Sequence, residues 1–305
     1  MVQKELKWEI KMAGIVQINT IGQWLKEYFG EKTVKLSIDG GFTCPNRDGT
    51  VGYGGCIFCS PGGSGELSGT INEQIELLSK KWPNVNSYIA YFQSHTNTYS
   101  SVDDLRKKFY DAIKGPGIVG LAIATRPDCL PYDVLDLLSE LNEKTFLWIE
   151  LGLQTIHGDK INRGYPLSVY DEKLAELKKR GIRVVTHLIL GLPGETKEDM
   201  LSSVSHVCTG KPFGIKLHLM NVVKGSAMET MYPGYTPFSS PKEYINLVCD
   251  IVEQVPEDIT IHRLTGDVPR KILISPSWSY KKRTILNGIS KELKRRGTHQ
   301  GSALK

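Results

Sequence analysis

Residues 35–60 read KLSIDGGFTCPNRDGTVGYGGCIFCS, and this stretch carries three cysteines just past a strand-like run. Cys56 and Cys59 form a close C-x-x-C pair, and eleven residues rich in glycine separate Cys44 from Cys56. Three thiols on one flexible loop at the end of a strand suit a metal ion or an iron–sulfur centre. No fourth cysteine lies nearby in the sequence.

The cysteines alone leave several kinds of site open. A structural zinc site is normally closed by four protein ligands, so Cys129 or His95 would have to supply the fourth. A four-iron cluster held by three thiolates instead keeps one iron free to bind another molecule. A C-x-x-C pair is also compatible with a redox dithiol or with two small buried residues.

Composition sets the outer limits. With 305 residues, 40% of them hydrophobic, the chain is long enough to bury a large core in one domain. No apolar run is long enough to span a bilayer, and the polar first residues lack the apolar core of a signal peptide. Six cysteines in so long a chain favour free thiols and a reducing compartment. We therefore expect a cytoplasmic globular protein without a membrane segment.

Basic residues gather at the C-terminal end of the chain, which has a formal net charge of +5. Ile285, Ile289 and Leu293 recur every four residues there, which predicts a helix that docks an apolar stripe and exposes basic groups. The basic residues of this tail are Lys281, Lys282, Arg283, Lys291, Lys294, Arg295, Arg296 and Lys305. Such a cluster suits a phosphate backbone, and a merely solvated basic terminus is the alternative.

Apolar, β-branched runs alternate with helix-length amphipathic stretches along the chain. We expect strands at 34–38, 88–92, 118–124, 146–153, 184–190, 215–220 and 259–261. We expect helices at 71–82, 102–113, 132–141, 169–180, 197–208 and 241–255. This alternation predicts an α/β fold, a partial-to-full (β/α) barrel with a parallel sheet, and its polar residues fall at the C-terminal strand ends. The expected domains are a helical lead-in (1–30, with its helix at 15–29), the barrel (31–278) and a basic C-terminal helix or tail (279–305).

Several strand ends carry motifs that together resemble one enzyme family. Besides the cysteine loop, these motifs are YFQSHTNTY (91–99), IATRPDCLP (123–131), ELGLQT (150–155), HLILGLPGET (187–196), IKLHLMNVVKGSAM (215–228) and HRLTGDVPR (262–270). In this order they resemble the radical S-adenosylmethionine (SAM) proteins of the bacterial YtqA/YhcC family. That family is related to the radical SAM domain of the Elongator catalytic subunit and, more distantly, to the oxygen-independent coproporphyrinogen oxidases. The long spacing between Cys44 and Cys56 departs from the common C-x3-C-x2-C pattern and matches this family.

The resemblance implies two cofactors, a [4Fe–4S] cluster and SAM. It assigns Cys44, Cys56 and Cys59 to three irons and the amino and carboxylate groups of SAM to the fourth. An electron from a low-potential donor, a flavodoxin or ferredoxin, would then cleave SAM to methionine and a 5′-deoxyadenosyl radical. The hard chemistry belongs to the cofactor, and the protein positions the reactants and excludes water.

The same resemblance suggests which residues contact SAM: Phe58, Gln93, Ser94, Glu150, Gln154, His187 and Leu192. Ordinary structural roles remain open for some of them. Phe58 could be a packing residue, His187 a satisfied core histidine, and Glu150 one half of an interior salt bridge, for example with Arg126. Candidates for the substrate side are His95, Asn97, Arg163, Lys216, His218 and Lys224. The other cysteines, Cys129, Cys208 and Cys249, are expected to be buried or half-buried thiols.

The likeness to Elongator and the basic tail together favour transfer RNA as the substrate, with wobble uridine as the target. Because this chain leaves no room after its barrel for an acetyltransferase domain, we expect a radical step other than carboxymethyl attachment. The specific hypothesis is conversion of a carboxymethylaminomethyl substituent to aminomethyl. Two alternatives stay open: the same barrel acting on a small molecule, and a metal-stabilised RNA-binding module without turnover.

Overall fold

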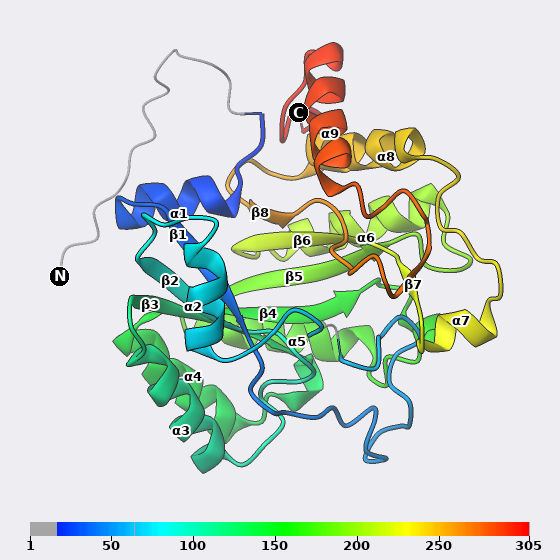
Figure 1. Cartoon of the computed structure of the whole chain (residues 1–305). Coiled ribbons are helices and arrows are strands. Elements are labelled where there is room, and N and C mark those ends of the chain that lie inside the picture. Colours follow the sequence, from blue (N-terminus) through cyan, green and yellow to red (C-terminus); the bar gives the residue numbers. More distant parts are fainter. Residues whose placement is uncertain (1–16, 64, 305) are drawn as a thin grey trace.

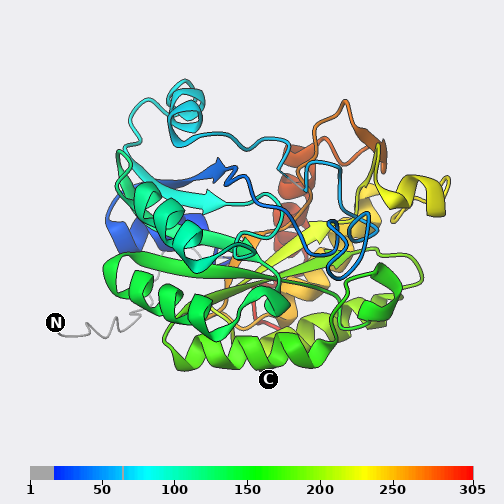
Figure 2. The same cartoon turned by 90° about the horizontal axis from the view of Figure 1, so that it is seen from below.

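Seven parallel strands form one curled sheet, seen in the computed structural model, which describes residues 17–63 and 65–304 (Figure 1). The strands follow one another in chain order, and each pairs in parallel with the next. They are β1 (Thr33–Ile38), β2 (Ser87–Phe92), β3 (Ile118–Thr125), β4 (Phe146–Gln154), β5 (Arg183–Leu190), β6 (Gly214–Leu219) and β8 (Thr260–Arg263). The two edge strands, β1 and β8, are not paired with each other. The predicted α/β barrel is therefore confirmed as a partial barrel, and Figure 2 shows its curl from below.

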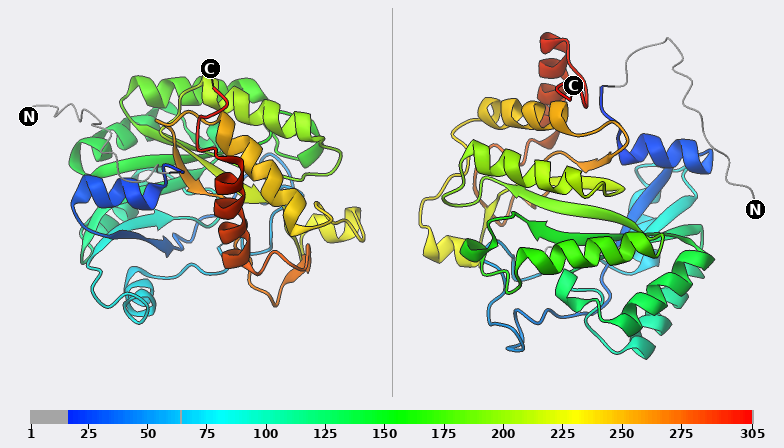
Figure 3. Two further views of the ribbon diagram at one scale, coloured as in Figure 1. Left: turned by 90° about the horizontal axis from the view of Figure 1, so that it is seen from above. Right: turned by 180° about the vertical axis from the view of Figure 1, so that it is seen from behind.

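Helices cover the outer face of the sheet (Figure 3). They are α2 (Ile71–Ser79), α3 (Val102–Ile113), α4 (Tyr132–Lys144), α5 (Leu167–Lys179), α6 (Lys197–Thr209) and α8 (Pro241–Gln254), with short 3-10 turns at Pro127–Cys129 and Gly158–Ile161. Several begin at a hydroxyl side chain that accepts a backbone N–H of the first turn, as Thr196 does at α6. Such caps satisfy amides that have no partner within the helix, so they fix where the helix starts.

Successive side chains of each strand point alternately to the two faces of the sheet. On β4, Leu147, Ile149 and Leu151 pack against the helices, whereas Trp148 and Glu150 point into the barrel. Both faces are buried, which explains why the strands read as continuous apolar runs. The interior nevertheless holds polar side chains near the C-terminal strand ends, and these define the site described below.

Helix α1 (Ile21–Phe29) closes the N-terminal end of the barrel. Thr20, its cap, bridges to Ile261 on β8, so the helix reaches the open edge of the sheet. Its Trp24 ring packs 5.6 Å from Phe146 and 4.9 Å from Phe213 in an aromatic layer inside the barrel. Within the predicted helical lead-in (1–30), the structure describes residues 17–30 and places α1 there. Residues 1–16 of that prediction lie outside the described residues. This layer leaves the C-terminal strand ends as the side on which a cavity can open.

Three elements near the C-terminal edge were not predicted. Strands β7 (Val222–Val223) and β9 (Leu273–Ser275) form a two-stranded antiparallel sheet, and α7 (Ala227–Met231) follows β7. They are too short to produce a readable hydrophobic period. Helix α9 (Lys282–Arg296) docks Ile285, Ile289 and Leu293 against the core beside α8, which confirms the predicted apolar stripe. Among the helices that the structure describes, none has the length and apolar character needed to cross a bilayer.

Candidate active site

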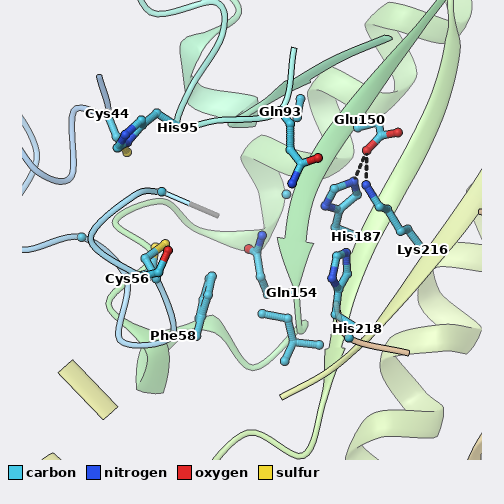
Figure 4. Close-up of a pocket in the computed structure, with 18 of the residues that line it drawn as sticks. Cys44, Cys56, Phe58, Gln93, His95, Glu150, Gln154, His187, Lys216 and His218 are labelled. Atoms are coloured by element: carbon cyan, nitrogen blue, oxygen red, sulfur yellow. Dashed lines mark hydrogen bonds and ion pairs between the residues drawn. The ribbon is translucent and has the colours of Figure 1, made fainter. Parts of the chain in front are cut away.

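A cavity of about 240 Å³ opens at the C-terminal ends of the strands. The three cysteines of the loop after β1 line it together with side chains from β2, β4, β5, β6 and β8. Figure 4 shows Cys44 and Cys56 on one side of this cavity and a group of polar side chains around Glu150 on the other. This volume is several times the roughly 30 Å³ of a water molecule, so the cavity has room for a small organic molecule.

The protein itself shapes the cysteine loop. The Arg47 guanidinium donates to the carbonyl oxygens of Ser60 (2.5 Å) and Pro61 (3.0 Å), which ties the two ends of the loop together. The Asn46 amide donates to the carbonyl of Asn162 at 2.5 Å and fastens the loop to the segment after β4. Gly55 has a φ of 85°, a left-handed conformation that favours glycine. These bonds hold the thiols at the cavity.

The electrostatics of the loop favour a thiolate at Cys59. A hydrogen bond from the Cys56 thiol, with a smaller contribution from Arg47, lowers the pKa of Cys59 to about 7. The same bond and burial raise the pKa of Cys56, which acts as the donor. Metal and cluster ligation require thiolates, so one cysteine of the pair is already biased toward the ligand form.

A single zinc ion does not suit this arrangement. Within residues 17–63 and 65–304, no three side chains of Cys, His, Asp or Glu gather closely enough to hold one metal ion. Neither His95 nor Cys129 completes such a group, and burial raises the pKa of the Cys129 thiol to about 12. The thiolates of a four-iron cluster stand farther apart than ligands of one ion, because each binds a different iron. The three thiols line one cavity but do not gather at a single metal position, which suits a cluster better than one ion.

Glu150 is the centre of the polar group in the barrel interior. Its Oε2 accepts a 2.7 Å bond from Lys216 Nζ and lies 2.6 Å from His187 Nε2. Its Oε1 accepts a 3.0 Å bond from Trp148 Nε1 and lies 3.7 Å from Lys35 Nζ. Both carboxylate oxygens are therefore occupied by protein groups.

The titration of these groups follows from their burial and pairing. Burial alone would raise the pKa of Glu150, but Lys216 and Lys35 hold it well below its usual value, so the carboxylate stays charged. Burial lowers the pKa of His187 to about 4, so its imidazole is neutral near pH 7. Burial also lowers the pKa of His218 well below its usual value. Burial likewise lowers the pKa of Lys216 well below its usual value and, less strongly, that of Lys35, whereas Glu150 opposes both shifts. The interior thus holds a charged carboxylate beside neutral histidines.

The interior salt bridge considered for Glu150 exists, but its expected partner was wrong. Arg126 instead donates to Asp128, at 2.9 Å to Oδ1 and 2.6 Å to Oδ2, because both side chains lie on the short turn after β3. The lysines that pair with Glu150 come from β1 and β6, and one of them is 66 residues away in the sequence. A contact to SAM through Glu150 remains a prediction.

The other predicted SAM contacts are divided between the cavity and its surroundings. Phe58, Gln93, Gln154 and His187 line the cavity with Glu150. Ser94 is buried beneath the glycine loop, where a Cβ on Gly65 would collide with its hydroxyl, and it is not part of the lining. Leu192 packs in a small apolar cluster with Ile57 and is likewise outside the lining.

Four of the six substrate-side candidates line the cavity: His95, Arg163, Lys216 and His218. Asn97 is buried behind it and donates to the carbonyl of Ala124, and Lys224 is exposed outside it. The Arg163 guanidinium donates to the carbonyls of Leu153 and Thr155, which indicates a structural role.

The cavity and the polar group around Glu150 also include residues that were not predicted from the sequence, among them Tyr91, Lys35 and Arg263. Tyr91 lines the cavity, and its hydroxyl accepts a 2.8 Å bond from Lys216 Nζ. Lys35 and Tyr91 stand on β1 and β2 at positions that alternate with outward apolar residues, so the period of two was a usable signal. Arg263, at the end of β8, also lines the cavity; it lies in the motif at 262–270, but no role was predicted for it.

The sequence of this chain matches two family models and several known proteins. The family model of the Radical SAM superfamily matches residues 44–207, and that of the Radical_SAM C-terminal domain matches residues 212–295. The chain is 45% identical to YtqA of Bacillus subtilis (strain 168) over 93% of its length and 91% of that protein. It is 36% identical to YhcC of Escherichia coli (strain K12) over 94% of its length and 95% of that protein.

More distant similarity extends to two further proteins. Half of the chain is 30% identical to 34% of a tRNA uridine(34) acetyltransferase of Dehalococcoides mccartyi (strain CBDB1). The fold resembles that of the archaeal Elp3 of Methanocaldococcus infernus lacking its N-terminus, with a TM-score of 0.66 at 17% identity. This likeness covers 88% of this chain and 64% of that one. At that identity the structural likeness establishes the fold alone.

Proposed function

Since this chain belongs to the radical SAM superfamily and to the family of YtqA and YhcC, we propose that it modifies the wobble uridine of tRNA. Members of this superfamily bind a [4Fe–4S] cluster and SAM. When bound together, these two cofactors supply a 5′-deoxyadenosyl radical that removes a hydrogen atom from the substrate. A low-potential flavodoxin or ferredoxin is the proposed electron donor.

The residues of the cavity fit these cofactors. Cys44, Cys56 and Cys59 would bind three irons, and the donor set of three soft thiols without a fourth leaves one iron open. Phe58, Gln93 and Gln154 face the same space and offer an aromatic face and amide groups for SAM. The aromatic layer around α1 excludes water from the closed end of the barrel.

In this proposal, Glu150 has a positioning role. It holds His187 and Lys216 at fixed places on the cavity wall, and its own oxygens are already occupied. Because Glu150 remains ionised and His187 remains neutral, the wall presents a stable charge pattern near pH 7.

The proposal that tRNA is the substrate rests on similarity to other proteins and on the basic residues of α9. One relative is a tRNA uridine(34) acetyltransferase, and the fold resembles an archaeal Elp3. The proposed reaction converts carboxymethylaminomethyl-uridine to aminomethyl-uridine, with SAM as the net two-electron oxidant. Loss of a hydrogen atom from the carboxymethyl methylene, followed by loss of one electron to the cluster and of the amine proton, would give an imine. Water would then hydrolyse the imine, which breaks the bond between the amine nitrogen and its carboxymethyl carbon and releases that unit as glyoxylate. The carboxymethyl methylene lies between an amine and a carboxylate, so a radical formed there is stabilised by both neighbours. This makes it a suitable site for hydrogen removal.

The observation that carries the proposal is the meeting of three thiols and a cationic barrel interior in one cavity of a radical SAM chain. Its test is the nucleoside composition of bulk tRNA from a deletion strain and its parent, measured by mass spectrometry. The proposal predicts accumulation of the carboxymethylaminomethyl nucleoside and loss of its aminomethyl or methylaminomethyl products. An unchanged profile would refute the tRNA substrate and favour a small-molecule substrate for the same cavity.

A further inference from the structure

A break in the β6–β8 register turns Arg263 into the cavity. Ile215 pairs with Ile261, but the next residue, Lys216, pairs with Arg263, so β8 has one extra residue at this point. A bulge of this kind lets neighbouring residues share one face of a sheet and re-aims a side chain, often beside an active site. His262 packs inside the barrel, with its ring 5.6 Å from that of Trp148, and Arg263 lines the cavity.

Arg263 differs from the other arginines of the cavity in its partners. Arg126 is paired with Asp128, and Arg47 and Arg163 donate to backbone carbonyls. The Arg263 guanidinium forms no hydrogen bond or ion pair with any residue that the structure describes. The acid that follows it, Asp267, is bonded to Lys282 at 2.5 Å. A fixed cation therefore faces the cavity with its donors available.

The surroundings of Arg263 carry a surplus of positive charge. Lys35 and Lys216 share the single carboxylate of Glu150, so Arg263 is the third cation around one anion. A guanidinium keeps its proton in proteins, so this surplus persists even when a buried lysine loses its proton. The low dielectric of the interior strengthens the attraction for an anion. A bound carboxylate would accept two parallel bonds from the planar guanidinium.

A second free polar atom lies on the neighbouring strand. His218 is two residues after Lys216 on β6 and lines the same cavity. Its Nε2 is buried and has no hydrogen-bond partner among the described residues. A ligand that reaches Arg263 can therefore also satisfy this nitrogen, which is costly to leave buried and unpaired.

We propose that Arg263, with His218 beside it, binds the carboxylate of the substrate's carboxymethyl group. This inference rests on the proposed function, and it names the residue that distinguishes substrate from product. The aminomethyl product lacks the carboxylate, so it forfeits this contact and leaves the cavity more readily. The carboxylate of SAM has the same chemistry, and the experiment below separates the two sources.

The test is equilibrium binding to the anaerobically reconstituted protein with SAM present and reductant absent, so that no turnover occurs. The probes are one tRNA carrying carboxymethylaminomethyl-uridine and the same tRNA carrying aminomethyl-uridine. We expect the wild type to prefer the first by at least about 10-fold, since a hydrogen bond to a charged group is worth about 1.5–3 kcal/mol. Arg263→Gln should bind both tRNAs with the affinity that the wild type has for the aminomethyl form, and Arg263→Lys should keep part of the preference.

Arg183→Gln is the matched control, because Arg183 begins β5 at the opposite end of the barrel and packs over Phe146. It should keep the full preference, and the iron content of every variant should equal that of the wild type. A preference retained in Arg263→Gln would overturn this inference alone. Loss of SAM affinity in Arg263→Gln with the tRNA preference intact would assign the guanidinium to SAM and overturn it as well. A wild type that binds both tRNAs equally would also overturn this inference, whereas a wild type that binds neither tRNA would overturn the proposed function itself.

Discussion

Glu150 Oε2 lies 2.7 Å from Lys216 Nζ, and the two side chains are buried in the barrel, 0% and 2% exposed. Ion pairs at the surface contribute little to stability, but breaking a buried one leaves a charge without a partner. Here the carboxylate also serves His187, Trp148 and Lys35. The pair is therefore the structural centre on which the cavity wall depends.

Glu150→Gln should lower the free energy of unfolding by about 3–5 kcal/mol, because Lys216 and Lys35 then lack their only described counter-charge. Urea denaturation followed by circular dichroism measures the loss. The double variant Glu150→Gln/Lys216→Met should recover part of it, since the buried cation is removed together with the anion. A loss below about 1 kcal/mol in the single variant would show that the pair is not structural.

Acidification should destabilise the protein partly through His187. Its pKa is about 4 in the folded state, below the ordinary value of 6.5, so the unfolded chain binds more protons between these values. Stability must then fall as the pH drops from 6.5 toward 4, by about 2 kcal/mol at pH 5 for this group. His187→Gln keeps a donor for Glu150 without titrating and should lose correspondingly less between pH 7 and pH 5. Equal losses in wild type and variant would contradict the assignment. The depressed pKa of Glu150 adds a loss of the same sign only below about 4.5.

Each of the three loop cysteines should be required for the cluster. After anaerobic reconstitution, the wild type should hold about four irons per chain with acid-labile sulfide. Cys44→Ala, Cys56→Ala and Cys59→Ala should lose most of the iron, the visible absorption and reductant-dependent 5′-deoxyadenosine. Cys208→Ala is the control, because Cys208 lies on α6 outside the cavity. Zinc in place of iron, with no SAM cleavage, would instead indicate a metal-stabilised binding module.

The basic residues of α9 should differ in their contribution to RNA binding. Arg296 bonds to Asp250, Glu253 and Glu292, so it is committed to the fold, whereas Lys291 and Lys294 are exposed. Lys291→Gln/Lys294→Gln should weaken tRNA binding and reduce the slope of log K against log salt by up to about 1.4–1.8. Arg296→Gln should lower the melting temperature and leave that slope unchanged. Equal slopes in wild type and double variant would remove α9 from the RNA interface.

Strong, long patterns made most of the fold predictable from the sequence. The seven strands of the sheet and six covering helices appear where continuous apolar runs and amphipathic periods placed them. Their boundaries differ by a few residues because end residues depend on caps and pairing. The β7–β9 pair could not be predicted, since two- and three-residue strands carry no period and owe their existence to tertiary contacts.

The candidate site was predictable in its chemistry and less so in its geometry. The three cysteines stood out because thiols in that spacing are rare, and the structure brings all three to one cavity. The partners of Glu150 depend on which strands become neighbours across the barrel, which no local pattern encodes. Arg263 faces the cavity because of a one-residue bulge in β8. The sequence of so short a strand does not reveal a register shift of one residue.

The most direct test of the central claim is turnover by the reconstituted protein. Purified tRNA carrying carboxymethylaminomethyl-uridine is incubated anaerobically with the enzyme, SAM and a low-potential reductant, and both products are quantified by mass spectrometry. The account predicts aminomethyl-uridine together with 5′-deoxyadenosine, and neither product with Cys56→Ala. Formation of 5′-deoxyadenosine with the tRNA unchanged would contradict the assigned substrate, whereas absence of 5′-deoxyadenosine from a fully loaded enzyme would contradict radical SAM catalysis itself.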